Sequence, residues 1–250
     1  AILAGSRSYP GAARLCSAAA VKAGAGLVTL VVPPDCVATL SASVIPEVMV
    51  RSLDDFRVLL NENWDAFGIG PGLGRERDEM ICDFLRHCST PCVVDADALN
   101  ALSGQMDVVR ENAGQRLLTP HHLEMERLSP CNGRDRLQWL ADFVSQYPVT
   151  LLLKGARTLI GNINSPVAFN TTGHPGMASG GMGDVLTGVC AALIAQGRDI
   201  TDSARLAAWV CGRAAELAIR ENTVSQESLT ASDVIAHLGG AFLDLRAGVF

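Results

Sequence analysis

The sequence predicts an α/β fold in which a mostly parallel sheet carries helices on both faces. Three observations predict it: short runs of β-branched and apolar residues recur, stretches with helical spacing separate them, and Gly- or Asp-rich turns follow them. Alternating strands and helices favour parallel pairing, because parallel neighbours need a crossover connection. The 250 residues, 48% of them apolar, suffice for a large core. We expect one domain over residues 1–250.

The expected strands are short apolar runs, and most of them end at a turn. They cover residues 2–4, 27–32, 66–69, 92–94, 116–118 and 149–153, with a β-pair at 158–160 and 167–169. The chain begins with Ala1 in what reads as the middle of a strand. We therefore expect that something upstream is missing from this sequence.

The expected helices carry apolar residues at helical spacing. They cover residues 11–23, 76–87, 137–146, 184–196, 202–220 and 231–245. In parallel α/β sheets, ligands bind beyond the carboxyl ends of the strands. The Gly- and Asp-rich turns lie at these ends, so we expect the functional site along this edge of the sheet.

Composition excludes several classes of function. The net charge of −6 argues against nucleic acid as the main partner, because phosphate neutralisation needs a basic face. No uninterrupted apolar stretch reaches the roughly 18 residues of a membrane span. The eight cysteines include no CxxC pair, which favours reduced, buried thiols of a cytoplasmic protein over disulfides or a zinc site. The only lysines are Lys22 and Lys154.

The strongest local signal is the loop at residues 170–184, which reads NTTGHPGMASGGMGD and leads directly into an apolar helix. The glycines allow the backbone to approach a ligand closely and to adopt positive φ. The helix that follows directs its free N–H groups and positive dipole end at the same place, an arrangement that holds phosphate. We therefore expect an anion cradle at Gly180, Gly181, Met182 and Gly183.

Asp184 stands at the start of this helix and is the candidate general base. A carboxylate is unsuited to binding an anion there, but it can accept a proton from a hydroxyl. A donor cradle beside a base suits phosphoryl transfer to an alcohol. The other interpretation is that Asp184 caps the helix, a role that Asp often fills. The loop itself leaves both interpretations open.

Several loops together resemble one family. The segment GGMGD at 180–184 is similar to the signature of ribokinase-like small-molecule kinases. The further segments are SRSYPGAA at 6–13, AGAGLV at 23–28, GPGLG at 70–74, DADALN at 95–100, LTPH at 118–121 with Glu124, and KGART at 154–158. In order and spacing they resemble the ADP- or ATP-dependent NAD(P)H-hydrate dehydratases over nearly the whole chain. The resemblance implies a ribokinase-like three-layer αβα sandwich.

The resemblance also implies a reaction. Members of this family repair NADH and NADPH whose nicotinamide ring has been hydrated, giving NADHX and NADPHX. A nucleotide phosphorylates the added ring hydroxyl of the S-form, and phosphate then leaves, restoring NAD(P)H. Hydroxide leaves poorly and phosphate leaves well, so a kinase-like site suits this lyase reaction. The implied cofactors are Mg²⁺ and ADP or ATP as co-substrate.

The family implies roles for individual residues. Asp184 would be the base, and Ala12, Gly72, His121 and Asp184 would contact the hydrated dinucleotide. The adenine nucleotide would bind Lys154, Gly155, Ala156, Arg157, Thr158 and Gly183. His122 and Leu123 stand where the family usually has proline and glycine.

Three acidic residues are expected to assist. Glu124 would contact Mg²⁺ indirectly, or else serve as a first-turn helix residue that complements the dipole. Asp95 and Asp97 end a strand at the same edge and would support the site, with Asp97 also suited to cap the next helix.

Other interpretations remain open from the sequence. The chain could be a ribokinase-like kinase of a vitamin precursor or sugar, or a dinucleotide-binding protein without catalysis. An intact Asp184 argues against the last. The sequence does not distinguish ADP from ATP, or NADHX from NADPHX. The family also implies a homo-oligomer, such as a tetramer, and an epimerase that is fused upstream or separate.

Overall fold

The computed structural model describes residues 1–111, 115–221 and 224–249. Within them the strands form one nine-stranded sheet in the order β3-β2-β1-β4-β5-β6-β7-β8-β9. The strands are β1 (Ile2–Leu3), β2 (Val28–Val32), β3 (Val48–Ser52), β4 (Phe67–Ile69), β5 (Cys92–Val94), β6 (Arg116–Leu118), β7 (Thr150–Leu153), β8 (Leu159–Asn162) and β9 (Ser165–Phe169). All neighbours from β3 to β7 pair in parallel, and β8 and β9 add an antiparallel edge. The predicted fold class is confirmed.

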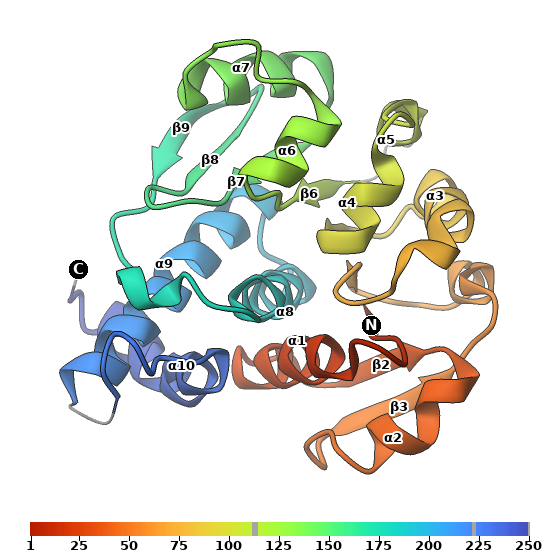
Figure 1. Cartoon of the computed structure of the whole chain (residues 1–250), viewed down its shortest axis with the longest axis horizontal. Helices are drawn as coiled ribbons and strands as arrows, with labels where there is room; N and C mark the ends of the chain where they lie inside the picture. Colours follow the sequence, from red (N-terminus) through yellow and green to blue (C-terminus); the bar gives the residue numbers. More distant parts are fainter. Residues whose placement is uncertain (112–114, 222–223, 250) are drawn as a thin grey trace.

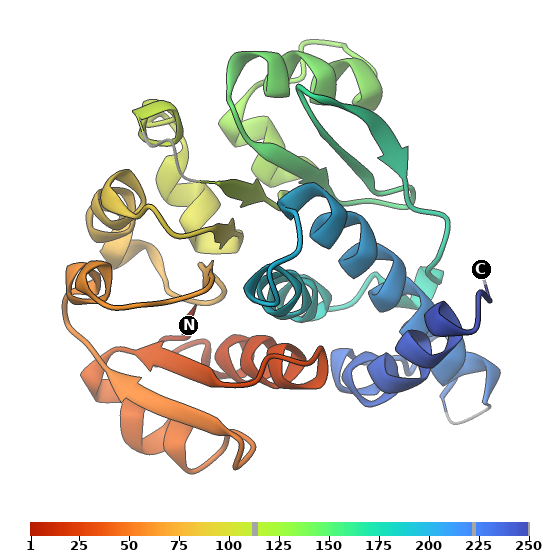
Figure 2. The ribbon, with the colours of Figure 1, turned by 180° about the vertical axis from the view of Figure 1, so that it is seen from behind.

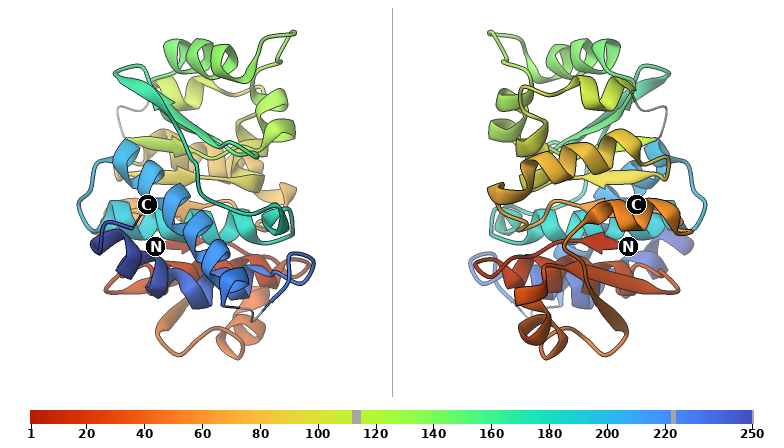
Figure 3. Two further views of the ribbon diagram at one scale, coloured as in Figure 1. Left: turned by 90° about the vertical axis from the view of Figure 1, so that its left-hand side faces the viewer. Right: turned by 90° about the vertical axis from the view of Figure 1, so that its right-hand side faces the viewer.

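Helices cover both faces of this sheet (Figure 1). They are α1 (Pro10–Lys22), α2 (Val37–Ser41), α3 (Asp78–His87), α4 (Ala96–Leu102), α5 (Asp107–Glu111), α6 (His122–Leu128), α7 (Arg136–Gln146), α8 (Met182–Ala195), α9 (Ile200–Arg220) and α10 (Ala231–Arg246). Helices α1, α8, α9 and α10 pack together on one face, and Figure 2 shows the same group from behind. Helix α7 and the β8–β9 hairpin lie at the opposite end of the molecule from α2 and β3 (Figure 3).

The core lies in two layers, one on each face of the sheet. Side chains alternate between the faces of a strand, so Val93 and Leu117 join the cluster under α1, α8, α9 and α10, whereas Val94 and Leu118 join the cluster under α3, α4 and α7. This alternation explains why the strands read as continuous apolar runs: both faces are covered.

Helix α8 is the central helix of its layer and carries the glycine loop at its start. Its residues from Val185 to Ile194 are all buried, as expected for a helix that is apolar on all sides. It packs between α1 and α9. The burial of this helix fixes where its N-terminus, and hence Asp184, stands against the sheet.

Several predicted boundaries and elements need correction. The helix expected from residue 76 begins with a 3-10 turn, Arg75–Arg77, before α3. Strand β3 and the short helices α2 and α5 were not predicted. Strand β3 lies at the edge of the sheet, and Val48 is its only buried residue, so it lacks the continuous buried apolar run of the central strands.

In the described part of the chain, the helices lack either the length or the apolar character that a bilayer crossing requires. Seven of the eight cysteines are buried, as predicted, and none of the eight, all of which lie in the described residues, forms a disulfide.

Candidate active site

The loops that follow β1, β4, β5, β6 and β7 meet at one edge of the sheet. Backbone hydrogen bonds connect them: Gly5 N donates to Pro71 O at 2.8 Å, and Lys154 N donates to Pro120 O at 2.9 Å. Gly70 has a φ of +126°, and a Cβ there would stand 1.8 Å from Asp95 O. Only glycine fits that position, because both the space and the φ exclude a side chain. These predicted loops therefore come together, whereas the segment 23–28 precedes β2 and lies at the opposite edge, where Gly24 faces Gln196 beyond the end of α8.

The anion cradle forms at the start of α8. Gly181 is the N-cap residue with a φ of +89°, and Met182, Gly183 and Asp184 form the first turn. The first N–H groups of a helix have no partner within the helix and carry the positive end of its dipole. A Cβ on Gly181 would lie 2.5 Å from Leu15 Cδ1, so glycine is needed for packing as well as for conformation.

Asp184 is half-buried in the first turn of α8, beside the cradle. Burial is the main reason that the pKa of Asp184 is raised to about 7, followed by the charge of Asp95, while the Lys154 ammonium opposes the rise. Asp97 and Glu124 raise the pKa of Asp184 further. A carboxylate with a pKa near neutrality is suited to accept a proton in catalysis.

The structure decides against a capping role for Asp184. The N-cap of α8 is Gly181, which has no side chain. By contrast, Asp233 holds the same third position in α10 and completes a capping box, since Thr230 N donates to its carboxylate at 2.8 Å. Asp233 is thus part of the cap of α10, whereas Asp184 interacts with a group of charged side chains.

Lys154 is the centre of that charged group. Its ammonium donates to Asp95 Oδ1 at 2.8 Å and lies 3.7 Å from Glu124 Oε2. Burial lowers the pKa of Lys154, but the two carboxylates outweigh it and leave the pKa raised. Thr187, one turn into α8, donates to Asp95 Oδ2 at 2.7 Å. The lysine is therefore a fixed positive charge.

His121 and Glu124 form the start of α6. The Nδ1 atom of His121 accepts from Glu124 N at 3.2 Å, and Glu124 Oε2 accepts from His121 N at 2.8 Å. This capping box forms although His122 and Leu123 depart from the family pattern. The other ring nitrogen of His121, Nε2, lies 3.5 Å from Glu124 Oε1, so the imidazole is held against the carboxylate at the start of α6.

Ala12 and Gly72 face each other across two loops. Gly72 has a φ of +66°, and a Cβ on it would stand 3.0 Å from the Cβ of Ala12. The small size of both residues lets the start of α1 and the loop after β4 pack closely together. Both residues lie at the edge of the sheet where the site is predicted, and their contact with the hydrated dinucleotide stays a prediction.

The segment 154–158 leaves β7 as an exposed turn at Gly155, Ala156 and Arg157. Arg136 supports this turn, since its guanidinium donates to the carbonyl oxygens of Leu153 at 3.0 Å and Arg157 at 3.0 Å. The sequence analysis did not single out Arg136. Its position at the start of the predicted helix before β7 was the only available signal.

Asp97 does not cap the next helix as predicted. The N-cap of α4 is Asp95, and Asp97 lies within the first turn. Its carboxylate instead accepts from Gly74 N at 2.9 Å and so holds the loop after β4. Asp97 thus supports the edge of the site, as the sequence indicated, by a different contact.

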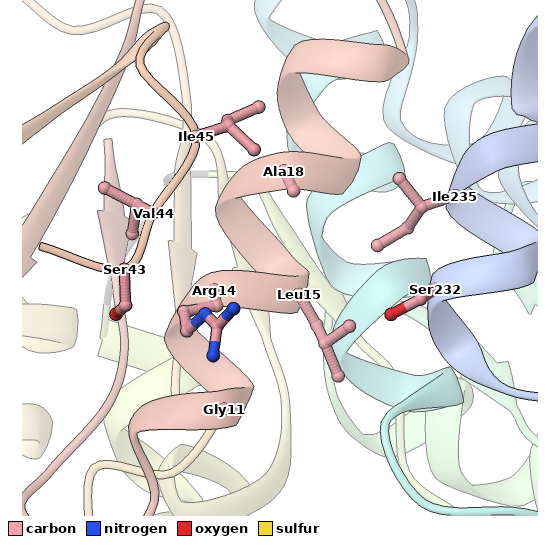
Figure 4. A pocket seen from close by; sticks show the side chains of 9 residues that line it. All are labelled: Gly11, Arg14, Leu15, Ala18, Ser43, Val44, Ile45, Ser232 and Ile235. Atoms are coloured by element: carbon pink, nitrogen blue, oxygen red, sulfur yellow. The ribbon is translucent and has the colours of Figure 1, made fainter.

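A pocket of about 420 Å³ lies beside the site rather than in it (Figure 4). Helix α1 forms its floor, with Val44 and Ile45 on one side and Ile235 of α10 on the other. None of the residues predicted for the site lines this pocket. Leu15 connects the two, because it lines the pocket and contacts Gly181.

Comparison with known proteins identifies the family. A family model described as NAD(P)H-hydrate dehydratase matches residues 1–237. The chain is 39% identical, over 94% of its length, to the bifunctional NAD(P)H-hydrate repair enzyme Nnr of Moorella thermoacetica. It spans about half the length of the curated relatives it matches.

Solved structures agree with this result. The ADP/ATP-dependent NAD(P)H-hydrate dehydratase from Bacillus subtilis, co-crystallised with ATP/Mg²⁺, superposes with a TM-score of 0.83 and 26% identity, covering 97% of this chain and 87% of that one. A ribokinase-like superfamily protein from Enterococcus faecalis has a TM-score of 0.82 and 27% identity, covering 97% and 86%. The predicted ribokinase-like architecture is confirmed, and the chain belongs to the NAD(P)H-hydrate dehydratase family.

Proposed function

We propose that this chain uses ADP or ATP to dehydrate the S-form of hydrated NADH or NADPH, and so repairs the damaged cofactor. The observation that carries the proposal is Asp184, a carboxylate whose pKa is about 7, at the mouth of the N–H cradle of α8. A protein that only binds a dinucleotide needs no such base. The family assignment supports the choice of substrate.

The chemistry proceeds in two steps. Asp184 accepts the proton of the ring hydroxyl while the hydroxyl oxygen forms a bond to the terminal phosphorus of the nucleotide, whose bridging P–O bond breaks. The N–H groups at Gly181 to Gly183 stabilise the charge on the transferring phosphoryl group. The lone pair of the ring nitrogen then expels phosphate, and loss of a ring proton restores the double bond.

The substrates would enter from two sides of Asp184. Ala12 and Gly72 would allow the hydrated dinucleotide to pass close to the backbone, and the half-exposed ring of His121 would contact it. The exposed turn at residues 154–158, together with Gly183, would hold the adenine nucleotide. An ammonium at Lys154 near the phosphates suits this arrangement.

Mg²⁺ would reach the site with the nucleotide. Among the described residues, no group of three or more His, Cys, Asp or Glu is arranged to hold a metal ion. Mg²⁺ commonly binds through substrate phosphates, water and one or two carboxylates, so the acidic edge fits it without a protein cage. Glu124, already engaged by His121 N and Lys154, would contact the ion indirectly. When bound, Mg²⁺ neutralises charge on the nucleotide phosphates.

The direct test is incubation of the protein with the S-form of hydrated NADH, Mg²⁺ and either ADP or ATP. We expect recovery of the absorbance of reduced nicotinamide together with release of one phosphate per turnover. Accumulation of a stable phosphate ester would instead indicate a kinase, and neither product would indicate a binding protein. The comparison of ADP with ATP, and of hydrated NADH with hydrated NADPH, identifies the preferred substrates.

The pH dependence provides a second test. The base must be ionised, and the pKa of Asp184 is about 7, so kcat/KM is expected to fall about tenfold per pH unit below this value. An unperturbed aspartate has a pKa of about 3.9 and would keep full activity down to about pH 5. A profile that stays flat between pH 8 and pH 5.5 would contradict the assignment of Asp184 as the base.

A further inference from the structure

Lys154 is held on the inner side of the cradle. A Cβ placed on Gly183 would stand 3.2 Å from Lys154 Nζ and 3.5 Å from Asp95 Oδ2, so the ion pair lies directly against the first turn of α8. Among the described residues, the ion pairs of Lys154 are with Asp95 and Glu124, and Asp184 acts on it through its charge alone.

Asp95 is itself firmly held. It is 1% exposed, its Oδ2 accepts from Thr187 at 2.7 Å, and its backbone N donates to Ile69 O at 3.0 Å. A buried carboxylate with a hydrogen-bond donor on one oxygen and an ammonium on the other has little freedom to move. The side chain of Lys154, by contrast, is long and flexible. Asp95 therefore determines where the ammonium stands.

The position matters because Asp184 is the alternative partner. An ammonium that paired with Asp184 would stabilise the charged carboxylate and make it a weaker base. The charged groups that face Asp184 are Asp95 and Asp97 of the β5–α4 segment, Glu124 of α6 and Lys154 after β7. Helix α1 contributes Cys16, a buried thiol whose pKa is raised well above its usual value and which is therefore uncharged.

We propose that Asp95 is a positioning residue for phosphoryl transfer, which holds the Lys154 ammonium beside Gly183 and away from Asp184, with Thr187 fixing Asp95. The inference rests on the proposed function. Two consequences follow for the reaction. A positive charge stays beneath the N–H groups that receive the phosphoryl group, and the base keeps its strength.

Two charge-changing variants should shift the pH–rate profile in opposite directions. Asp95→Asn removes a negative neighbour and releases Lys154 toward Asp184, so the acid limb of kcat/KM should move to lower pH by about one unit, with at least a roughly tenfold loss of kcat at pH 8. Lys154→Met removes the opposing positive charge, so the limb should move to higher pH. If these residues only stabilised the fold, the two variants would give less folded protein, but the acid limbs of their pH–rate profiles would not move in opposite directions.

The control is Thr150→Val, since Thr150 is also a buried threonine, 6% exposed, whose hydroxyl bonds Thr201 at 3.0 Å away from the catalytic edge. Its profile should match that of the wild type. If Asp95→Asn leaves the limb in place, or moves it in the same direction as Lys154→Met, the positioning role is wrong. If the wild-type protein itself fails to dehydrate hydrated NADH, the proposed function is wrong.

A spectroscopic measurement tests the geometry without turnover. The chain has only two lysines, so ¹⁵Nζ-lysine labelling gives two ammonium signals, with the exposed Lys22 as internal reference. The Lys154 signal should exchange slowly with water and should change as Asp184 titrates near pH 7. In Thr187→Val, which preserves every charge and serves if Asp95→Asn does not fold, this exchange should become at least about tenfold faster. Rapid exchange of both signals in the wild type would overturn the proposal.

Discussion

Asp184→Asn should lower the rate of dehydration of hydrated NADH by roughly 10²–10⁴-fold, the usual contribution of a general base. The amide has nearly the same shape as the carboxylate but cannot accept the hydroxyl proton. Binding of the dinucleotide and of ADP should change little, because the amide keeps the shape with which Asp184 would contact the dinucleotide. The measurements are single-turnover kinetics for the chemical step and calorimetry for the two affinities.

The matched control is Asp202→Asn. Asp202 holds the third position of α9, as Asp184 does in α8, but its side chain is 71% exposed and pairs with Arg205 at 3.3 Å. This variant should keep full activity. Near-normal turnover in Asp184→Asn would contradict the mechanism, whereas a loss in both variants would indicate a general effect of the helix starts.

Stability should separate the chemical role of Asp184 from misfolding. The folded pKa of about 7 lies above the usual value for aspartate, so the folded state favours the protonated form. As the pH rises from about 4 to 7, the unfolded chain releases the proton of Asp184 more readily than the folded protein does, so the free energy of unfolding decreases. Asp184→Asn should therefore unfold at the same temperature as the wild type at pH 8, or at a higher one. A catalytic site that costs stability is a common compromise.

The fold and the main site were predictable from the sequence because their signals are local. Apolar runs such as 92–94 define buried strands, and Gly181 before the helix has a positive φ that other residues rarely adopt. The carboxyl-end rule then places the loops at one edge of the sheet. The burial of most cysteines also followed from their spacing.

The contacts within the site were not predictable, because they join residues that lie far apart in the sequence. Lys154 could equally have pointed into solvent, and nothing in the sequence linked Thr187 to Asp95, 92 positions earlier. Whether Asp95 or Asp97 stands at the N-cap depends on where α4 begins. The exact ends of a helix are what a sequence pattern predicts least accurately. Arg136 supports the segment 154–158 only because α7 packs beside β7.

Gly188→Ala should give the largest loss of stability among conservative changes in α8. A Cβ on Gly188 would stand 2.1 Å from the backbone oxygen of Cys16 in α1, and backbone cannot rotate away as a side chain can. Alanine favours a helix by about 1 kcal/mol over glycine, but overpacking of a buried interface costs about 3 kcal/mol. The net loss should lower Tm by roughly 5 °C.

Gly239→Ala is the control that isolates the clash. Gly239 lies inside α10, and a Cβ there meets nothing within 4 Å, so this variant should gain the helical preference and raise Tm slightly. Gly188→Ala should also lose activity, since relieving the clash displaces α8 from α1, and Asp184 is one turn before Gly188. If Gly188→Ala were as stable and as active as Gly239→Ala, then the close contact between α1 and α8 would not be what fixes the base at the sheet edge.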